Sequence, residues 1–194
     1  MRSVPPPVRN LDLRNCLGDL LDKALSKPER AMPLYALRAF GRVVEGQERA
    51  AIRYEALIEA VAAAVREVGS LVSAKEATED LITTGLLRHP GEVDGERWVV
   101  AGEGLRSELR PAISRVDAYC RALETLWRRA VRSEGVLEWA MKEAACLFNE
   151  GLFFEVHEVL EAVWLKEEGQ VRLLLQGLIQ IAEEHTSELQ SRTL

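Results

Sequence analysis

The sequence predicts a mainly α-helical protein with one β-hairpin in its N-terminal half and a helical bundle in its C-terminal half. Apolar residues recur at steps of three and four over most of the 194-residue chain, which is the spacing of one buried helix face. Only residues 86–105 change to turn signals flanked by short apolar runs. The 13 glycines and 7 prolines are too few for a disordered or fibrous chain, so a globular protein is expected.

Composition and charge argue against several classes of protein. The chain is 47% hydrophobic and 29% charged. It has neither a signal-peptide core nor an apolar run of about 18 residues, so we expect a cytoplasmic protein with no membrane partner. Its net charge of −6 opposes nonspecific binding to phosphate backbones. Because Cys16, Cys120 and Cys146 are far apart in apolar helical patterns, we expect buried, reduced thiols.

Residues 1–108 are predicted to form a winged-helix-like helical module. Three apolar helical stretches precede a fourth helix from Ala74 to Ile82. Ser73 can cap this helix, with Glu76 at the capping-box position. A hairpin follows, marked by His-Pro-Gly and Asp-Gly turns. The order of helices followed by one hairpin resembles a winged helix-turn-helix.

This resemblance allows two interpretations, DNA binding through the presumed recognition helix at residues 74–82, or a protein contact. The charges of the helix and of the wing favour the protein contact, because acidic side chains are repelled by phosphates. The helix carries Lys75 with Glu76, Glu79 and Asp80, and the wing carries Arg88 and Arg97 with Glu92, Asp94 and Glu96.

Two further segments are predicted after the winged helix. Residues 109–135 contain a long amphipathic connecting helix, and residues 136–182 form a helical bundle. The bundle opens with a helix from Val136 to Asn149, and two more helices are joined by a turn at Gly169.

A cluster of polar residues lies on the last two helices of the bundle. At about 100° per residue, His157, Glu161 and Trp164 fall within an arc of roughly 60° at the border of the buried face. Gln176 and Gln180 lie one turn apart on the following helix.

The sequence around this cluster resembles the family catalogued as domain of unknown function 309. The matching residues are Phe153-Phe154-Glu155-x-His157-Glu158-x-Leu160-Glu161-x-x-Trp164, then Gly169, then Leu175-Gln176-Gly177-Leu178-Ile179-Gln180-x-Ala182. The resemblance covers about 40 residues. It implies a small all-helical bundle found in bacterial and archaeal cytosolic proteins, with no established biochemical activity.

Three roles fit the polar cluster. The first is a half-buried network in which His157 bonds to Glu161, the Trp164 N–H is satisfied nearby and Gln176 or Gln180 completes the set. The second is a pocket for a small-molecule ligand or a protein partner. The third is a divalent metal site or an acid-base pair, which would use His157 and Glu161.

The metal interpretation is limited by the number of ligands on one face. Glu158 and Glu155 point about 100° and 160° away from His157 on an ideal helix, so a single ion would reach only His157 and Glu161 easily. We therefore expect no cofactor, and we count Glu158 in the polar cluster without assigning it as a metal ligand.

No catalytic residue is assigned. Cys146 lies on an apolar helix face, and the chain has no Gly-x-Ser-x-Gly, P-loop or dinucleotide fingerprint. The leading hypothesis is thus a non-enzymatic binding or scaffolding protein. The alternatives are a DNA-associated regulator acting through the winged helix, and a metal-dependent or acid-base enzyme using His157 and Glu161.

The end of the chain departs from the family pattern after Ala182. Residues 183–191, EEHTSELQS, resemble the translation of a sequencing-library adapter. We therefore expect residues 183–194 to be non-native, the bundle to be truncated, and the apolar face with Leu178 and Ile181 to be uncovered. His185 is not counted as a site residue. The sequence of the intact gene tests this expectation.

Overall fold

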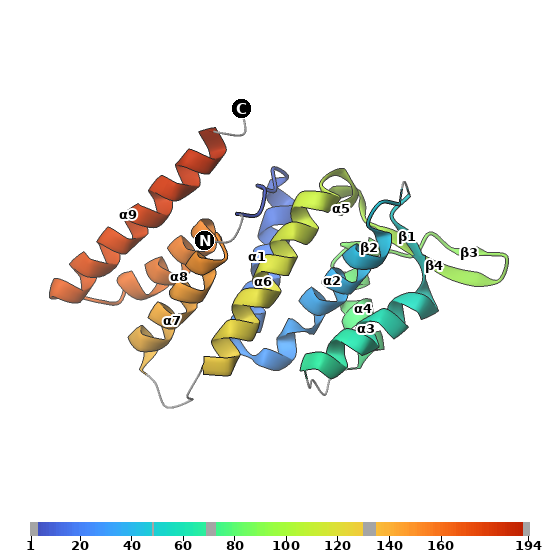
Figure 1. Ribbon diagram of the computed structural model, residues 1–194, viewed down its shortest axis with the longest axis horizontal. Helices are drawn as coiled ribbons and strands as arrows, with labels where there is room; N and C mark the ends of the chain where they lie inside the picture. The colour runs from blue at the N-terminus through green and yellow to red at the C-terminus, as the bar shows by residue number, and fades with distance from the viewer. Residues whose placement is uncertain (1–3, 48, 69–72, 130–134, 192–194) are drawn as a thin grey trace. The chain divides into compact units, whose positions relative to one another are not determined.

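The computed structural model describes residues 4–47, 49–68, 73–129 and 135–191 (Figure 1). These residues form α-helices, one short 3-10 helix and short β-strands, which confirms the predicted mainly α fold. The chain divides into two units. One is Val8–Asp117, and the other combines Met1–Pro7 with Ala118–Leu194. Each unit is described separately below.

The unit Val8–Asp117 is built from helices around a small antiparallel sheet. Its helices are α1 Leu11–Ser26, the 3-10 helix Pro28–Ala31, α2 Met32–Val44, α3 Tyr54–Val68, α4 Ala74–Thr83, α5 Glu103–Ser107 and the first part of α6 Leu109–Arg129. Its strands are β1 Ala51–Arg53, β2 Leu87–Arg88, β3 Glu92–Val93 and β4 Glu96–Ala101.

The sheet has the strand order β1-β4-β2, with β3 paired to β4 in the protruding hairpin (Figure 1). All three strands that pair with β4 are antiparallel to it, with Ile52 opposite Val99, Leu87 opposite Ala101 and Glu92 opposite Arg97. The chain order α2-β1-α3-α4-β2-β3-β4 confirms the predicted hairpin after a series of helices, and the assignment of residues 1–108 as a winged-helix-like module stays a prediction. Strand β1 was not predicted, because three residues are too few to show an alternating pattern.

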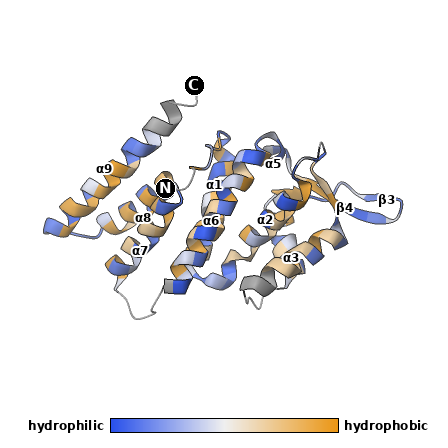
Figure 2. Cartoon of the chain, in the orientation of Figure 1, coloured by the Kyte–Doolittle hydropathy of each residue, from blue (hydrophilic) through white to orange (hydrophobic). Residues whose placement is uncertain are grey.

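Local signals and burial explain why these helices form. The Asn10 side chain accepts a hydrogen bond from the Leu13 N–H and caps α1, and Ser73 and Glu76 form the predicted capping box at α4. The core takes the apolar face of each element, as the hydropathy colouring shows (Figure 2). Its buried side chains include Leu17, Leu34, Leu37, Phe40, Leu57, Leu81, Leu87 and Val99.

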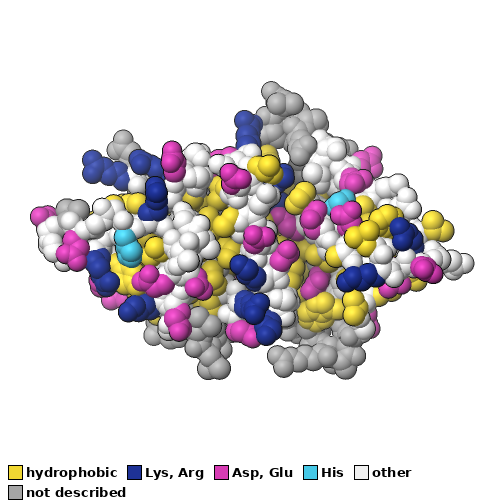
Figure 3. Space-filling view, turned by 180° about the vertical axis from the view of Figure 1, so that it is seen from behind, with side chains coloured by type: hydrophobic (Ala, Val, Ile, Leu, Met, Phe, Trp, Pro, Cys, Tyr) yellow, Lys and Arg dark blue, Asp and Glu magenta, His cyan; other side chains and the backbone are white. Residues whose placement is uncertain are grey.

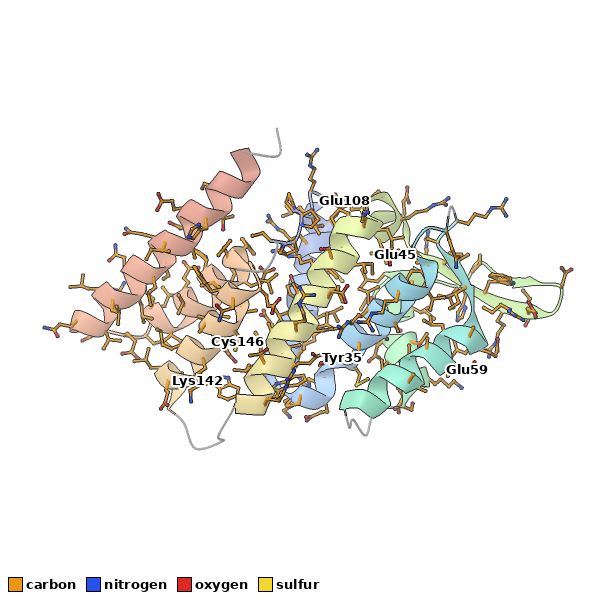
Figure 4. The ribbon with its side chains drawn as sticks, in the orientation of Figure 1. Tyr35, Glu45, Glu59, Glu108, Lys142 and Cys146 are labelled. Carbon is orange, nitrogen blue, oxygen red and sulfur yellow. The ribbon has the colours of Figure 1, made fainter. Side chains whose placement is uncertain are left out.

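A pair of hydrogen bonds ties the start of this unit to its last helices. Glu108, between α5 and α6 (Figure 4), accepts 2.5 Å hydrogen bonds from the backbone N–H groups of Arg9 and Asn10. Because these bonds join residues about a hundred positions apart, they fix where α1 begins relative to α5 and α6.

The second unit is a helical bundle, as predicted. It contains α6 from Ala118 onward, α7 Val136–Asn149, α8 Phe153–Trp164 and α9 Gly169–Ser191. Helix α8 packs between α7 and α9. The buried core side chains of this unit include Leu147, Leu152, Phe153, Val156, Leu160, Leu175 and Ala182. The finer division into residues 1–108, 109–135, 136–182 and 183–194 stays a prediction.

Helix α9 leaves part of its apolar surface exposed. Leu173 and Leu174 are 69% and 61% exposed, and Ile181 is 46% exposed. The helix continues past Ala182 to Ser191 without a break, and residues 192–194 lie outside the described part of the chain. Among the described residues, no helix has both the length and the apolar character needed to cross a bilayer.

Candidate functional site

The presumed recognition helix α4 presents an acidic surface. Its buried face, Ala74, Ala77, Thr78 and Leu81, packs into the core. The exposed charged side chains are those of Lys75, Glu76 and Asp80. Glu79 is partly withdrawn, because its Oε1 accepts a 2.7 Å hydrogen bond from the Tyr54 hydroxyl on α3.

Arg53 on β1 and Arg97 of the wing form ion pairs with carboxylates of the same unit. Arg97 on β4 pairs with Glu55 at 3.0 Å, and its guanidinium lies 4.2 Å from the centre of the Tyr54 ring. Arg53 on β1 pairs with Glu96 at 2.8 Å. The hydrogen bond that Arg97 donates to Glu55 raises the pKa of Arg97, so this guanidinium stays charged and is paired within the unit. A phosphate that approaches either arginine would meet a carboxylate beside it.

Tyr54 anchors the wing to the helices behind it. Only 3% of its surface is exposed, and burial and the hydrogen bond to Glu79 raise its pKa to about 12. Its ring also contacts His89, with 5.3 Å between the ring centres, and His89 Nδ1 lies 3.1 Å from the carbonyl oxygen of Trp98. His89 thus serves to hold the hairpin against α3.

The polar cluster on α8 brings together three side chains with metal-ligand chemistry. One ligand atom each from His157, Glu158 and Glu161 can be chosen so that all three lie within 4.8 Å of one another. His157 Nδ1 lies 3.3 Å from Glu158 Oε1, and His157 Nε2 lies 3.1 Å from Glu183 Oε1 on α9. The interpretation that only His157 and Glu161 share a face was therefore too narrow. The angle of 100° per residue gives only the direction of each Cβ atom. Rotation about the side-chain bonds of Glu158 brings its carboxylate back toward His157.

The rest of the predicted cluster is arranged differently from the expected network. The close partners of His157 are Glu158 and Glu183 rather than Glu161. The Trp164 Nε1 atom is buried and has no hydrogen-bond partner among the described residues, and the Trp164 ring instead stacks with Arg172, whose Cζ lies 4.1 Å from the ring centre. Gln176 and Gln180 are exposed on α9. Any functional role of these residues stays a prediction.

Two buried carboxylates were not singled out by the sequence. Glu155 is 6% exposed and accepts a 2.5 Å hydrogen bond from the Tyr119 hydroxyl. Glu150 is 5% exposed and pairs with Arg121 at 2.8 Å. A signal existed for Glu155, because this acid stands between Phe154 and Val156 on a helix with a strongly apolar face. Glu155 thus connects α6 to α8, and Glu150 connects α6 to the end of α7.

His185 packs on aromatic rings. Its ring is stacked on Phe153 with 4.8 Å between centres, and it meets Phe148 edge-on at 5.8 Å. It therefore lies against the apolar part of α7 and α8.

The cysteines do not offer an activated nucleophile. Cys120 and Cys146 are buried, and Cys146 lies on α7 (Figure 4). Cys16 is only half-buried, in contrast to the expectation, because it borders a shallow groove beside Asp12 and Gly104. Burial raises the pKa of the Cys16 thiol, and Asp19 raises it further, so the reactive thiolate is disfavoured.

The comparisons with known proteins identify one part of the chain. Residues 141–183 match the family described as Domain of unknown function (DUF309), which confirms the resemblance of the C-terminal part. The matched segment contains all of α8 with most of α7 and the first part of α9. Neither a curated protein nor a solved structure matches the chain at a significant level.

Proposed function

We propose that this protein is a non-enzymatic binding or scaffolding protein whose winged-helix unit contacts another protein rather than nucleic acid. The observation that carries the proposal is the pairing of Arg97 with Glu55 and of Arg53 with Glu96. These pairs place a carboxylate beside two cations of the surface that a nucleic-acid-binding winged helix would turn toward the phosphates.

The remaining charges on this surface are mainly acidic. The exposed bases Lys75 and Arg88 stand against the exposed acids Glu76, Asp80, Glu92 and Asp94. Acidic and basic side chains are also interspersed on the face of the molecule seen in Figure 3. The acidic excess on α4 and the wing supports a partner with a basic surface, because complementary charge speeds encounter and excludes wrong partners.

A DNA-binding measurement separates this function from a DNA-associated regulator. Fluorescence anisotropy with a labelled DNA duplex should show no saturable binding by the full-length protein at physiological salt. Nonspecific DNA binders have dissociation constants of about 10⁻⁴ to 10⁻⁶ M under these conditions. Salt-dependent binding that is lost in the variants K75E and R88E would establish the DNA alternative and overturn the proposal.

A second measurement looks for the partner itself. Nuclease-treated cell extract is passed over the immobilised protein, and each retained protein is identified, purified and titrated with it. We expect Asp80→Lys to weaken this interaction and Asp19→Lys to leave it unchanged. Both aspartates are exposed, but Asp19 lies on α1 rather than on α4. Equal binding by both variants would remove α4 from the interface.

A further inference from the structure

The donor atoms on α8 have a spacing that matches the coordination sphere of a metal ion. The atoms His157 Nδ1 and Glu158 Oε1 are 3.3 Å apart. Two ligands at about 2.1 Å from a tetrahedral Zn²⁺ ion are separated by about 3.4 Å, and two adjacent octahedral ligands by about 3.0 Å. The third residue, Glu161, offers a carboxylate oxygen that lies within 4.8 Å of one ligand atom of His157 and one of Glu158, and rotation about its side-chain bonds can bring this oxygen closer.

The rest of α8 holds the backbone of these donors in place. Val156, Leu160 and Val163 are each at most 7% exposed and fix one face of the helix in the core. The side chains of His157 and Glu158 are 21% and 55% exposed. The donors therefore stand on a rigid helix at the edge of the core, where an ion can enter from water and keep water ligands.

The second nitrogen of His157 already has an acceptor. Nε2 lies 3.1 Å from Glu183 Oε1, a distance at which a proton on Nε2 can be donated to that carboxylate, and this tautomer leaves the lone pair of Nδ1 on the side of Glu158. This is the tautomer that a metal at Nδ1 requires. Glu183 itself is not one of the three proposed ligands.

From this geometry we propose that His157, Glu158 and Glu161 bind one divalent transition-metal ion of the Zn²⁺ class. One imidazole and two carboxylates supply nitrogen and oxygen donors that suit such an ion, and water completes the coordination. The proposal assigns ion binding and no reaction. It is independent of the proposed function, since the three ligands belong to the bundle and not to the winged-helix unit.

The test is metal binding by the full-length protein, with Zn²⁺ in calorimetry and Co²⁺ in visible absorption spectroscopy. We expect one ion per chain and visible ligand-field bands for Co²⁺ that report nitrogen and oxygen ligands. His157→Ala, Glu158→Gln and Glu161→Gln should each weaken binding at least tenfold, because each removes one ligand.

Two control variants test whether the effect is specific. His89→Ala removes an exposed histidine of the winged-helix unit, and Glu168→Gln neutralises an exposed carboxylate just beyond α8, and both should bind metal as the unchanged protein does. Thermal unfolding without metal shows whether each variant is folded. If His157→Ala does not fold, the two glutamine variants decide the outcome. Absence of saturable binding, or equal binding by the folded ligand variants and the controls, overturns the proposal.

Discussion

The hydroxyl of Tyr119 on α6 donates a 2.5 Å hydrogen bond to Glu155 Oε1 on α8, and both residues are buried. The bond joins the continuous helix α6 to the centre of the segment that matches the DUF309 family. A buried carboxylate needs such donors, because its charge loses the solvation of water.

Removing this hydroxyl should destabilise the protein. Tyr119→Phe leaves the ring in place but takes one donor from Glu155, and we expect a loss of about 1–3 kcal/mol in the free energy of unfolding. Urea unfolding measures the loss. In a double-mutant cycle with Glu155→Gln, the two changes should not be additive, with a coupling of about 0.5–3 kcal/mol. Simple additivity would mean that the contact contributes nothing.

The ion pair between Arg121 and Glu150 should matter more than a surface pair of similar type. Glu150 has a 6% exposed side chain, and Arg121→Ala leaves this carboxylate without its 2.8 Å partner, at an expected cost of about 1–3 kcal/mol. Lys142 pairs with Glu138 at 3.4 Å on the surface of α7, so Lys142→Ala should cost about 0.5 kcal/mol or less. Equal losses in chemical unfolding would contradict the assigned burial of Glu150.

Two glycines in helices should respond in opposite directions to the same substitution. A Cβ atom at Gly41 on α2 would lie 2.5 Å from Ile113 Cγ2 on α6, so Gly41→Ala should destabilise the protein by about 1–3 kcal/mol. Gly18 on α1 has open space at the same position, so Gly18→Ala should stabilise it by about 0.5–1 kcal/mol. The difference in urea midpoint between the variants checks both predictions. A stabilising Gly41→Ala would show that α2 and α6 do not approach as closely as described.

The raised pKa of Tyr54 should make the free energy of unfolding decrease at high pH. Its pKa is about 12 in the folded protein, against an ordinary value of 10.0. Between these values the folded state keeps the phenolic proton and the unfolded state loses it, so unfolding becomes more favourable as the pH rises. The contribution is complete below pH 10 and is lost as the pH passes about 12. Urea unfolding across this range should show a shallower pH dependence for Tyr54→Phe, and identical slopes would refute the assigned environment.

Much of the fold could be predicted because local patterns determine it. The capping residues Ser73 and Glu76 marked the start of α4, and apolar spacing placed α7 at Val136–Asn149 with the bounds that the structure has. Strand β1 escaped prediction because its three residues form a strand only by pairing with β4.

The sequence predicted which residues belong to the candidate site, but not how their side chains are arranged. The motif singled out His157, Glu158, Glu161 and Trp164. The position of each carboxylate was not determined by helix spacing, because rotation about the side-chain bonds moves a glutamate oxygen by several ångströms. For the same reason the sequence did not predict that Trp164 would stack with Arg172.

The sequence alone determined the helical fold class, the one hairpin, the acidic character of α4 and the family of the C-terminal segment, since all of these depend on residue type and spacing along the chain. The tertiary structure decided which charges neutralise one another at the wing, which carboxylates are buried under α6, and that Glu158 joins His157 and Glu161. These relationships depend on distances between elements and on side-chain rotamers, and both are set when the core packs.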